Sequence, residues 1–256
     1  DCVEDLGKVG KDEGFCRILE KVGKHGLKRK ERREMERRWR KERSRGVPSP
    51  SAVFRYLRGF CDERQDGLRE VGKAFIPLAN EPLRGFVEVM KVFLSFMQKH
   101  RRQEVATLDM DATLVETGKS DALFCYEGYR AYQPLNTWWA EQEVVVHTEF
   151  RDGNVPAGYE QLRVLKEALS ILPEGVKKVR VRSDTAGYQH ELMKYCEGGG
   201  NKRFGRVEFA IGCDVTPEFK KAVREIKESE WHPLHKEVKG KQVETKKSWA
   251  EVCFVP

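Results

Sequence analysis

Two aspartates stand two positions apart in the segment 107–113, where apolar and acidic residues alternate. A β-strand points successive side chains to opposite faces, so Asp109 and Asp111 would share one face while the apolar residues beside them share the other. Carboxylates are poor strand formers and repel each other at this spacing, so their charge needs compensation. A divalent cation suits this role because hard cations prefer carboxylate oxygens. The alternative is a solvent-facing edge strand whose aspartates have no function.

A third aspartate, Asp184, ends the alternating segment 177–184 and lies 73 residues after Asp111. Sites in mixed α/β sheets form at the carboxyl ends of strands. If the two strands are neighbours, Asp111 and Asp184 can face each other across two metal ions that assist the attacking and leaving oxygens of phosphodiester transfer. Mg²⁺ fits carboxylates that leave it water and substrate phosphate. The alternative is that Asp184 only caps the helical turn that follows it.

The elements around these aspartates follow a defined order. Alternating apolar residues predict strands at 107–113, 134–140, 143–150, 177–184 and 207–213. Apolar residues at helical spacing predict helices at 86–97, 157–172, 188–197 and 217–229. Three strands followed by helix–strand alternation predict the α/β class, with a mixed sheet and helices on its faces.

The positive charge of the chain is concentrated in residues 28–45. The whole chain of 256 residues has a net charge of +7, and this segment holds eleven Lys or Arg against four Glu, so its excess equals that of the chain. The segment contains good helix formers and almost no apolar side chains, so a helix here would bury little surface. Such a helix can lie along phosphates, where each neutralised phosphate adds salt-sensitive affinity. The alternative is a solvated linker helix.

A second helix is expected after the basic segment. Ser49 can cap it and Pro50 fits its first turn, and Arg55 and Arg58 flank its apolar stripe. A short helix after a basic one suits a small DNA-binding module, although a core helix with arginines at its rim is commoner. The DNA-binding candidates of both helices are Lys28, Arg29, Lys30, Arg32, Arg33, Arg37, Arg38, Arg40, Lys41, Arg43, Arg55 and Arg58.

Cysteine and hydropathy patterns exclude several classes of protein. The seven cysteines form no CxxC pair, which is typical of reduced thiols in a cytosolic protein rather than of a disulfide framework or zinc knuckle. His232 and His235 have paired spacing, but the proline between them makes a poor metal scaffold. The charged start shows no signal peptide, and the apolar run 86–97 is too short for a bilayer and is interrupted by Glu88 and Lys91.

Six blocks of the sequence resemble the successive motifs of DDE-type insertion-sequence transposases, which share a ribonuclease-H-like core with retroviral integrases. The resemblance covers about residues 105–256, in matching order and spacing. Residues 48–55 resemble the N-terminal DNA-binding region of these enzymes less distinctively. The six blocks are Leu108–Thr113, Thr117–Lys119, Gly128–Tyr129, Pro134–Leu135, Arg151–Val155 and Val181–Tyr188.

The resemblance implies a ribonuclease-H-like mixed sheet with flanking helices, preceded by a mostly helical N-terminal region. It implies that Asp111 and Asp184 are the first two catalytic carboxylates, with Asp109 as a further metal ligand or an alternative to Asp111. These carboxylates would hold Mg²⁺ (or Mn²⁺) for hydrolysis at the transposon end and for strand transfer by the freed 3′-hydroxyl. The expected partners are double-stranded DNA, as terminal inverted repeats and as target, and a second copy of the chain. The expected location is the prokaryotic cytoplasm, at the nucleoid and not at a membrane.

The third carboxylate of the family, a Glu within a Tyr/Arg/Glu/Lys block on a late helix, has no match here. Glu218, Glu225 and Glu228 come too early and lack the Tyr/Arg context. The chain begins without Met and stops in strand-like sequence, so we expect a truncated copy whose catalytic activity is open. A non-catalytic DNA-binding remnant is the alternative. The expected parts are a helical DNA-binding region 1–104, an incomplete catalytic core 105–235 and the start of a β-rich insertion 236–256.

Overall fold

The computed structural model describes residues 3–42, 47–70, 72–238 and 240–252, without the side chains of 38–42 and 66. The chain divides into two units, Asp1–Phe93 and Leu94–Pro256. The α-helices described are α1 (Leu6–Val9), α2 (Glu13–Lys24), α3 (Arg29–Glu42), α4 (Pro50–Arg58), α5 (Glu63–Asp66), α6 (Glu81–His100), α7 (Gln161–Ile171), α8 (His190–Glu197) and α9 (Pro217–Arg224). The strands described are β1 (Val105–Ala112), β2 (Val115–Glu116), β3 (Ala131–Tyr132), β4 (Leu135–Trp139), β5 (Val144–Glu149), β6 (Lys178–Ser183), β7 (Glu208–Ile211), β8 (His232–Val238) and β9 (Lys241–Trp249). Within these ranges, none of the helices is long and apolar enough to span a membrane.

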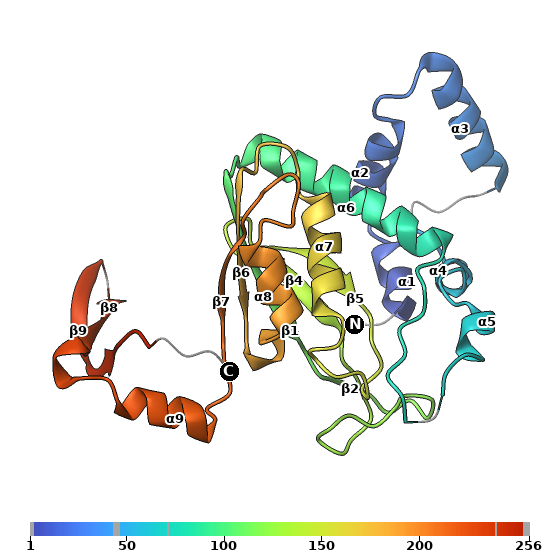
Figure 1. The fold of residues 1–256 in the computed structure, drawn as a ribbon. Coiled ribbons are helices and arrows are strands. Elements are labelled where there is room, and N and C mark those ends of the chain that lie inside the picture. Colours follow the sequence, from blue (N-terminus) through green and yellow to red (C-terminus); the bar gives the residue numbers. More distant parts are fainter. Residues whose placement is uncertain (1–2, 43–46, 71, 239, 253–256) are drawn as a thin grey trace. The chain divides into compact units, whose positions relative to one another are not determined.

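Helices make up the first unit (Figure 1). The basic segment is helical as predicted, and Lys24 of α2 lies 3.1 Å from a carboxylate oxygen of Glu36 in α3. The predicted start of α4 is confirmed, because Ser49 Oγ accepts a hydrogen bond from the Ala52 amide at 3.3 Å. The helix α6 begins before the predicted stripe because Asn80 caps it, with its Oδ1 accepting from the Leu83 amide at 3.1 Å.

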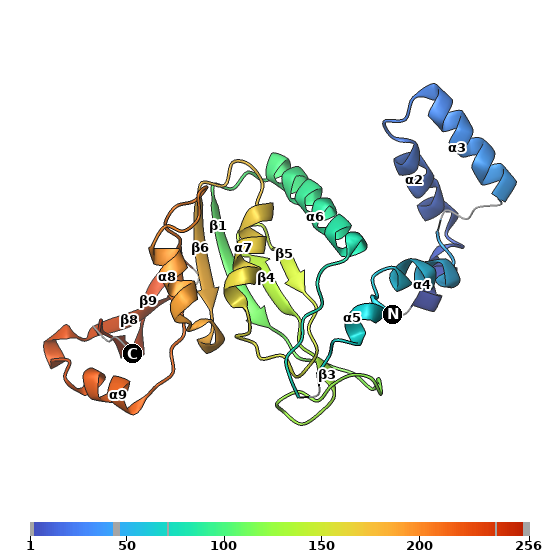
Figure 2. The same ribbon diagram turned by 45° about the vertical axis from the view of Figure 1, so that its right-hand side comes forward.

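A five-stranded sheet in the order β5-β4-β1-β6-β7 organises the second unit. The strands β1, β6 and β7 run parallel to one another, whereas β4 is antiparallel to both β1 and β5. Figures 1 and 2 show α7 and α8 together on one face of this sheet. The predicted α/β fold, a ribonuclease-H-like mixed sheet with flanking helices after a helical region, is confirmed by this order and direction of strands.

The two faces of the sheet differ in polarity because its strands alternate. The face under α7 and α8 is apolar, and side chains of the strands and of both helices are buried there, so this face holds the core. The opposite face presents Asp109, Asp111, Arg180 and Arg182, which are half-buried or exposed. The buried side chains of the core include Leu108, Met110, Leu135, Trp139, Val179, Val181, Val164, Leu165, Ala168, Leu169, Leu192 and Cys196.

Three features depart from the predicted elements. The helix α7 starts at Gln161 rather than Ala157, because Glu160 at its N-cap has a positive φ of 50° and its carboxylate lies 2.6 Å from Arg163 Nε. The helix α9 ends at Arg224, and a separate 3₁₀ turn covers Glu228–Glu230. The short strands β2 and β3, which pair with each other, lie outside the segments that the alternation predicts to be strands.

Candidate active site

Asp111 and Asp184 lie at matching positions on neighbouring parallel strands. The strands β1 and β6 keep one register from the pair Val105–Lys178 to the pair Met110–Ser183. Asp111 is the next residue of β1 and Asp184 directly follows the last residue of β6, and both are exposed. The condition that these two strands are neighbours is therefore met, and both carboxylates stand at the carboxyl-terminal edge of the sheet, where sites form in such folds.

Asp184 also caps the turn that follows β6. Its Oδ1 accepts a hydrogen bond from the Ala186 amide at 3.0 Å, at the start of the 3₁₀ turn Thr185–Gly187. The structural role that the sequence offered as an alternative is thus present. A carboxylate can accept at about four lone-pair positions, so one bond leaves capacity for a cation. Capping holds the side chain in place and is compatible with metal binding.

Asp109 has a cationic partner on the same face of the sheet. Arg182 faces it across the β1–β6 pair, and the two side chains form a bidentate ion pair with Nη2 2.6 Å from Oδ2. The ion pair raises the pKa of Arg182, chiefly through its hydrogen bond with Asp109. The charge of Asp109 is therefore compensated by Arg182, whereas the sequence led us to expect compensation by a metal ion.

Asn136 is a neighbour of Asp111 that is not among the predicted site residues. It pairs with Asp111 in the antiparallel β1–β4 register, and its Oδ1 accepts a hydrogen bond from Thr148 Oγ1 at 2.7 Å. The signal was present in the alternation of β4, because Leu135 and Thr137 are buried and Asn136 between them must point to the aspartate face. An amide oxygen beside Asp111 adds a polar group to this edge.

The loops at this edge pack closely because glycines leave room for them. A Cβ at Gly187 would come within 2.6 Å of Ser183 Oγ, and a Cβ at Gly158 would come within 2.9 Å of the Ala186 carbonyl oxygen. A Cβ at Gly153 would overlap the Ala131 carbonyl oxygen. Two of the six sequence blocks, residues 151–155 and 181–188, thus take part in this close packing.

A buried arginine fixes the loop between β5 and α7. The side chain of Arg151 is fully buried, and its guanidinium donates to Glu149 Oε1 at 2.8 Å through Nε. Burial lowers the pKa of Arg151, against the opposing effect of Glu149. Glu149 also lies 2.6 Å from Arg163, which is 2.9 Å from Glu167 on α7. This chain of ion pairs joins the block 151–155 to the helix behind the sheet.

The DNA-binding candidates of the first unit whose side chains the structure describes are exposed. Arg32 donates from Nε to the Leu27 carbonyl at 2.8 Å, and Arg58 lies 3.7 Å from Glu63. The side chains of Arg38, Arg40 and Lys41, and the whole of Arg43, lie outside the described part of the chain. The exposed candidates are Lys28, Arg29, Lys30, Arg32, Arg33, Arg37, Arg55 and Arg58.

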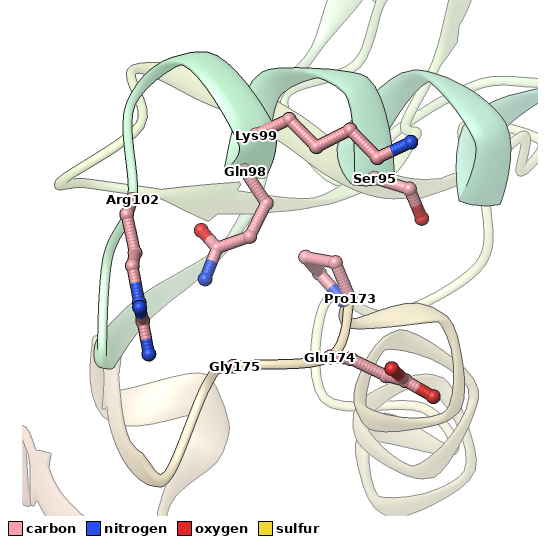
Figure 3. Close-up of a pocket in the computed structure, with 7 residues that line it drawn as sticks. All are labelled: Ser95, Gln98, Lys99, Arg102, Pro173, Glu174 and Gly175. Carbon is pink, nitrogen blue, oxygen red and sulfur yellow. The ribbon is translucent and has the colours of Figure 1, made fainter.

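A pocket of about 490 Å³ lies at the opposite edge of the sheet (Figure 3). Lys99 and Arg102 line it from the end of α6 and the segment before β1, and Glu174 and Gly175 line it from the turn before β6. Gln98 also lines the pocket, and its Nε2 donates a hydrogen bond to the Gln103 carbonyl at 2.7 Å. This pocket lies beside the amino ends of β1 and β6, whereas Asp111 and Asp184 stand at their carboxyl ends, so it is not part of the candidate active site.

Comparison with known proteins identifies the family of this chain. A family model described as transposase DDE domain group 1 matches residues 78–254. The chain belongs to this family. A comparison with curated proteins finds no match. Among solved structures, a chain of the Drosophila P element transposase strand transfer complex is similar over 94% of this chain and 52% of that one, with 14% identity and a TM-score of 0.32. The chain thus spans about half the length of that protein.

The family generally uses divalent metal ions. Asp111 and Asp184 suit such an ion because they are exposed carboxylates at neighbouring strand ends, and hard cations take carboxylate oxygens. Within the described residues, no group of three His, Cys, Asp or Glu side chains is placed to hold a metal ion. The two aspartates therefore fit as part of a ligand set rather than as a complete one.

Proposed function

We propose that this chain is the DNA-binding and partial catalytic portion of a transposase that cleaves transposon ends and joins them to target DNA. The observation that carries the proposal is the shared register of Asp111 and Asp184 at the edge of β1 and β6, within the region matched by the family. Phosphodiester chemistry needs carboxylates in such a position, because they hold cations that offset charge on the reacting phosphate.

In the proposed reaction, the oxygen of a water molecule attacks a phosphorus atom at the transposon end, the bond from phosphorus to the 3′-oxygen breaks, and a 3′-hydroxyl is released. That hydroxyl then attacks a phosphorus atom of the target strand in the same way. Asp111 and Asp184 would hold Mg²⁺ or Mn²⁺, which activates the attacking oxygen and stabilises the leaving one. The turn at Ala186 orients Asp184, and the pairing of β1 with β6 orients Asp111.

The predicted role of Asp109 as a metal ligand stays a prediction, and its ion pair with Arg182 supports a different one. We propose that Asp109 and Arg182 form an ion pair without net charge beside the metal site, and that Arg182 thereby removes the charge of Asp109 from the site. The reaction also needs a further acidic ligand beside Asp111 and Asp184. We propose that this ligand comes from another segment or from another subunit, and not from the described residues at this edge of the sheet.

We propose that the exposed basic face of α3, together with Arg55 and Arg58 of α4, binds double-stranded DNA at the terminal inverted repeats. Charge concentrated in one exposed helix supports this, because phosphate contacts supply most non-specific DNA affinity. The Drosophila P element structure is a strand transfer complex, and we propose that this chain likewise acts on DNA, as a homodimer at the nucleoid of a prokaryotic cytoplasm. The proposed boundaries remain 1–104, 105–235 and 236–256.

Paramagnetic broadening of ¹H–¹⁵N resonances by Mn²⁺ tests the metal site in the chain as it exists. Mn²⁺ should broaden signals around Asp111 and Asp184 at the edge of the sheet before those of the opposite edge. The double variant Asp111→Asn/Asp184→Asn should lose this broadening, while Glu218→Gln/Glu225→Gln on and after α9 should keep it. Equal broadening in both double variants would refute the assignment.

A salt titration of DNA affinity tests the basic helix. Replacing Arg29, Lys30, Arg32, Arg33 and Arg37 by Gln should flatten the slope of log K against log salt by about 0.9 per lost phosphate contact. A matched control replaces five exposed cations of the second unit by Gln, and its slope should stay close to that of the wild type. The control residues are Arg224, Lys236, Lys241, Lys246 and Lys247.

The exposed cations of α3 also support a second candidate function, a DNA-binding protein without catalysis. It shares the salt-dependent binding of the first candidate but gives no role to Asp111 and Asp184. The two functions separate in one experiment, because only the catalytic candidate predicts that Mn²⁺ broadening at both aspartates strengthens when DNA ends are added. Binding of DNA without any such effect would favour the non-catalytic function.

A further inference from the structure

The segment between β2 and β3 folds into a small hairpin, residues 122–131, which we call the aromatic hairpin. Its arms are joined by hydrogen bonds from the Cys125 amide to the Tyr129 carbonyl at 2.9 Å and from the Ala131 amide to the Leu123 carbonyl at 3.1 Å. Gly128 turns the chain at its tip with a positive φ of 86°. The side chains of Ala122 and Cys125 are buried. The hairpin is therefore an anchored structure with a defined shape.

The aromatic hairpin displays apolar rings to solvent. Phe124 is 58% exposed and Tyr126 is 79% exposed, although burial of an aromatic ring is favourable in a folded protein. The Arg130 guanidinium lies 4.7 Å from the centre of the Phe124 ring, and Lys119 lies 5.9 Å from the ring of Tyr132. Exposed rings interleaved with cations are the combination that binds unpaired nucleic acid, because every base offers a π-face and every nucleotide a phosphate.

Two packed loops connect the aromatic hairpin to the candidate active site. Gly153 packs against the carbonyl groups of Leu123 and Ala131 at the base of the hairpin. From the same loop region, Gly158 accepts a hydrogen bond from Gln189 Nε2, and that Nε2 also donates to the Ala186 carbonyl at 2.9 Å, in the turn capped by Asp184. Figures 1 and 2 both show the segment after β1 at the end of the sheet where β1 ends.

The electrostatics of Tyr126 agree with this placement. Its pKa is raised, mainly by the charge of Glu127 and also by the charge of Asp184. The same loop raises the pKa of Tyr129 to about 12, chiefly through a hydrogen bond with Glu127. Glu127 is thus a hydrogen-bond partner of both hydroxyls, and the two tyrosines differ in exposure, because Tyr129 is half-buried whereas Phe124 and Tyr126 are exposed.

We propose that Phe124 and Tyr126 form a stacking site for unpaired bases of a DNA strand whose backbone passes Asp111 and Asp184. The inference rests on the proposed function, which places a DNA end at this edge. A duplex hides the faces of its bases, so two exposed rings gain stacking only where the strand is frayed or single-stranded. Arg130 and Lys119 would meet the phosphates of the same strand, and the ligand class is therefore an unpaired deoxynucleotide segment beside the reacting phosphate.

Fluorescence anisotropy with two DNA probes tests the stacking site in the full chain. One probe is a blunt duplex and the other is the same duplex with a four-nucleotide 3′ overhang. Stacking on aromatic rings changes affinity by about 5- to 150-fold per base, so the wild type should prefer the overhang probe at least fivefold. The variant Phe124→Ala/Tyr126→Ala should bind both probes equally, with its blunt-duplex affinity unchanged. Because both side chains are exposed, the variant should keep the wild-type circular dichroism spectrum.

Two further measurements separate stacking from other roles of these rings. A 2-aminopurine in the overhang should lose fluorescence when wild type binds, and should keep it with the double variant. The variant Phe124→Tyr/Tyr126→Phe should restore the preference, while Trp249→Ala, at an exposed ring on β9, should leave it intact. A preference that survives in the double alanine variant overturns the proposal. The proposal is also overturned if the double alanine variant keeps its DNA binding and loses only self-association in analytical ultracentrifugation, because the two rings would then bind protein.

The outcomes also distinguish this inference from the proposed function. If the chain binds neither probe, the proposed function fails together with the stacking site. If it binds both equally, the DNA-binding function stands and the stacking site alone fails. If the overhang preference is present but Mn²⁺ does not broaden signals at Asp111 and Asp184, the stacking site stands and the catalytic assignment fails.

Discussion

Arg182 donates two parallel hydrogen bonds to Asp109 across the β1–β6 pair. This pair lies on the same face of the sheet as Asp111 and Asp184, two positions earlier on each strand. The contact is bidentate, which is the strongest geometry for a guanidinium and a carboxylate. It joins neighbouring strands next to the proposed metal ligands. The charges of Arg182 and Asp109 therefore offset each other, and the pair lies beside the two other carboxylates, Asp111 and Asp184.

This ion pair gives Asp109 and Asp111 different behaviour on substitution. Asp111→Asn removes a ligand and should weaken Mn²⁺ binding by more than about tenfold, since loss of a mere supporting residue typically costs about 10- to 100-fold. Asp109→Asn should weaken it only a few-fold, because it leaves the charge of Arg182 uncompensated near the cation. Electron paramagnetic resonance of free Mn²⁺ measures both.

The double variant Asp109→Asn/Arg182→Gln provides the control for that comparison. It restores the local net charge, so Mn²⁺ affinity should return close to the wild-type value. If Asp109 were itself a ligand, the second substitution would not rescue the first, and the assignment of Asp109 as a neighbour would be wrong.

Glu149→Gln should strongly destabilise the second unit. It leaves the fully buried guanidinium of Arg151 without its carboxylate, and breaking a buried pair costs about 3–5 kcal/mol. Urea denaturation followed by circular dichroism measures the loss. Glu197→Gln removes the partner of Arg206 in an exposed pair and should cost under about 1 kcal/mol. Equal losses in the two variants would show that burial of Arg151 is not the cause.

Gly153→Ala should displace the aromatic hairpin. The added Cβ overlaps the Ala131 carbonyl oxygen and comes within 3.0 Å of the Leu123 carbonyl oxygen, so one of the two loops must move. We expect a lower melting temperature and a reduced preference for the overhang probe. Gly118→Ala, where a Cβ meets nothing within 4 Å, is the matched control and should behave as the wild type. A wild-type overhang preference in Gly153→Ala would show that the hairpin does not depend on this contact.

The lowered pKa of Glu167 makes the free energy of unfolding depend on pH. Its pKa is lowered from 4.5, first by contact with His147, whose Nε2 lies 3.1 Å away, and then by Arg163. A lowered folded-state pKa means that the contribution is complete above the unfolded-state value and is lost as the pH falls through the folded-state value. Glu167→Gln should therefore be less stable than the wild type at pH 7, and the difference should shrink below about pH 4.5. Urea midpoints from pH 7 to pH 3 test this, and a constant difference would contradict it.

Local patterns in the sequence were enough to predict most of the second unit. Alternation revealed β1, β4, β5, β6 and β7, and helical spacing revealed α7 and α8, because the core face of each element must be apolar. The starts and ends of helices were less predictable. The start of α7 depends on Glu160 meeting Arg163 and on the packing of Gly158, and neither contact leaves a periodic signal.

The amino-acid sequence by itself determined the order of strands and helices, the aspartates on one face of β1, the basic helix and the likeness to the family, since each depends on neighbours along the chain. Only the tertiary structure decided which side chains meet. Strand pairing put Asp184 beside Asp111 and Arg182 beside Asp109, and loop packing anchored the hairpin of Phe124 and Tyr126. Those contacts join residues about thirty to seventy positions apart, and the register that makes them is fixed by burial of the whole sheet face.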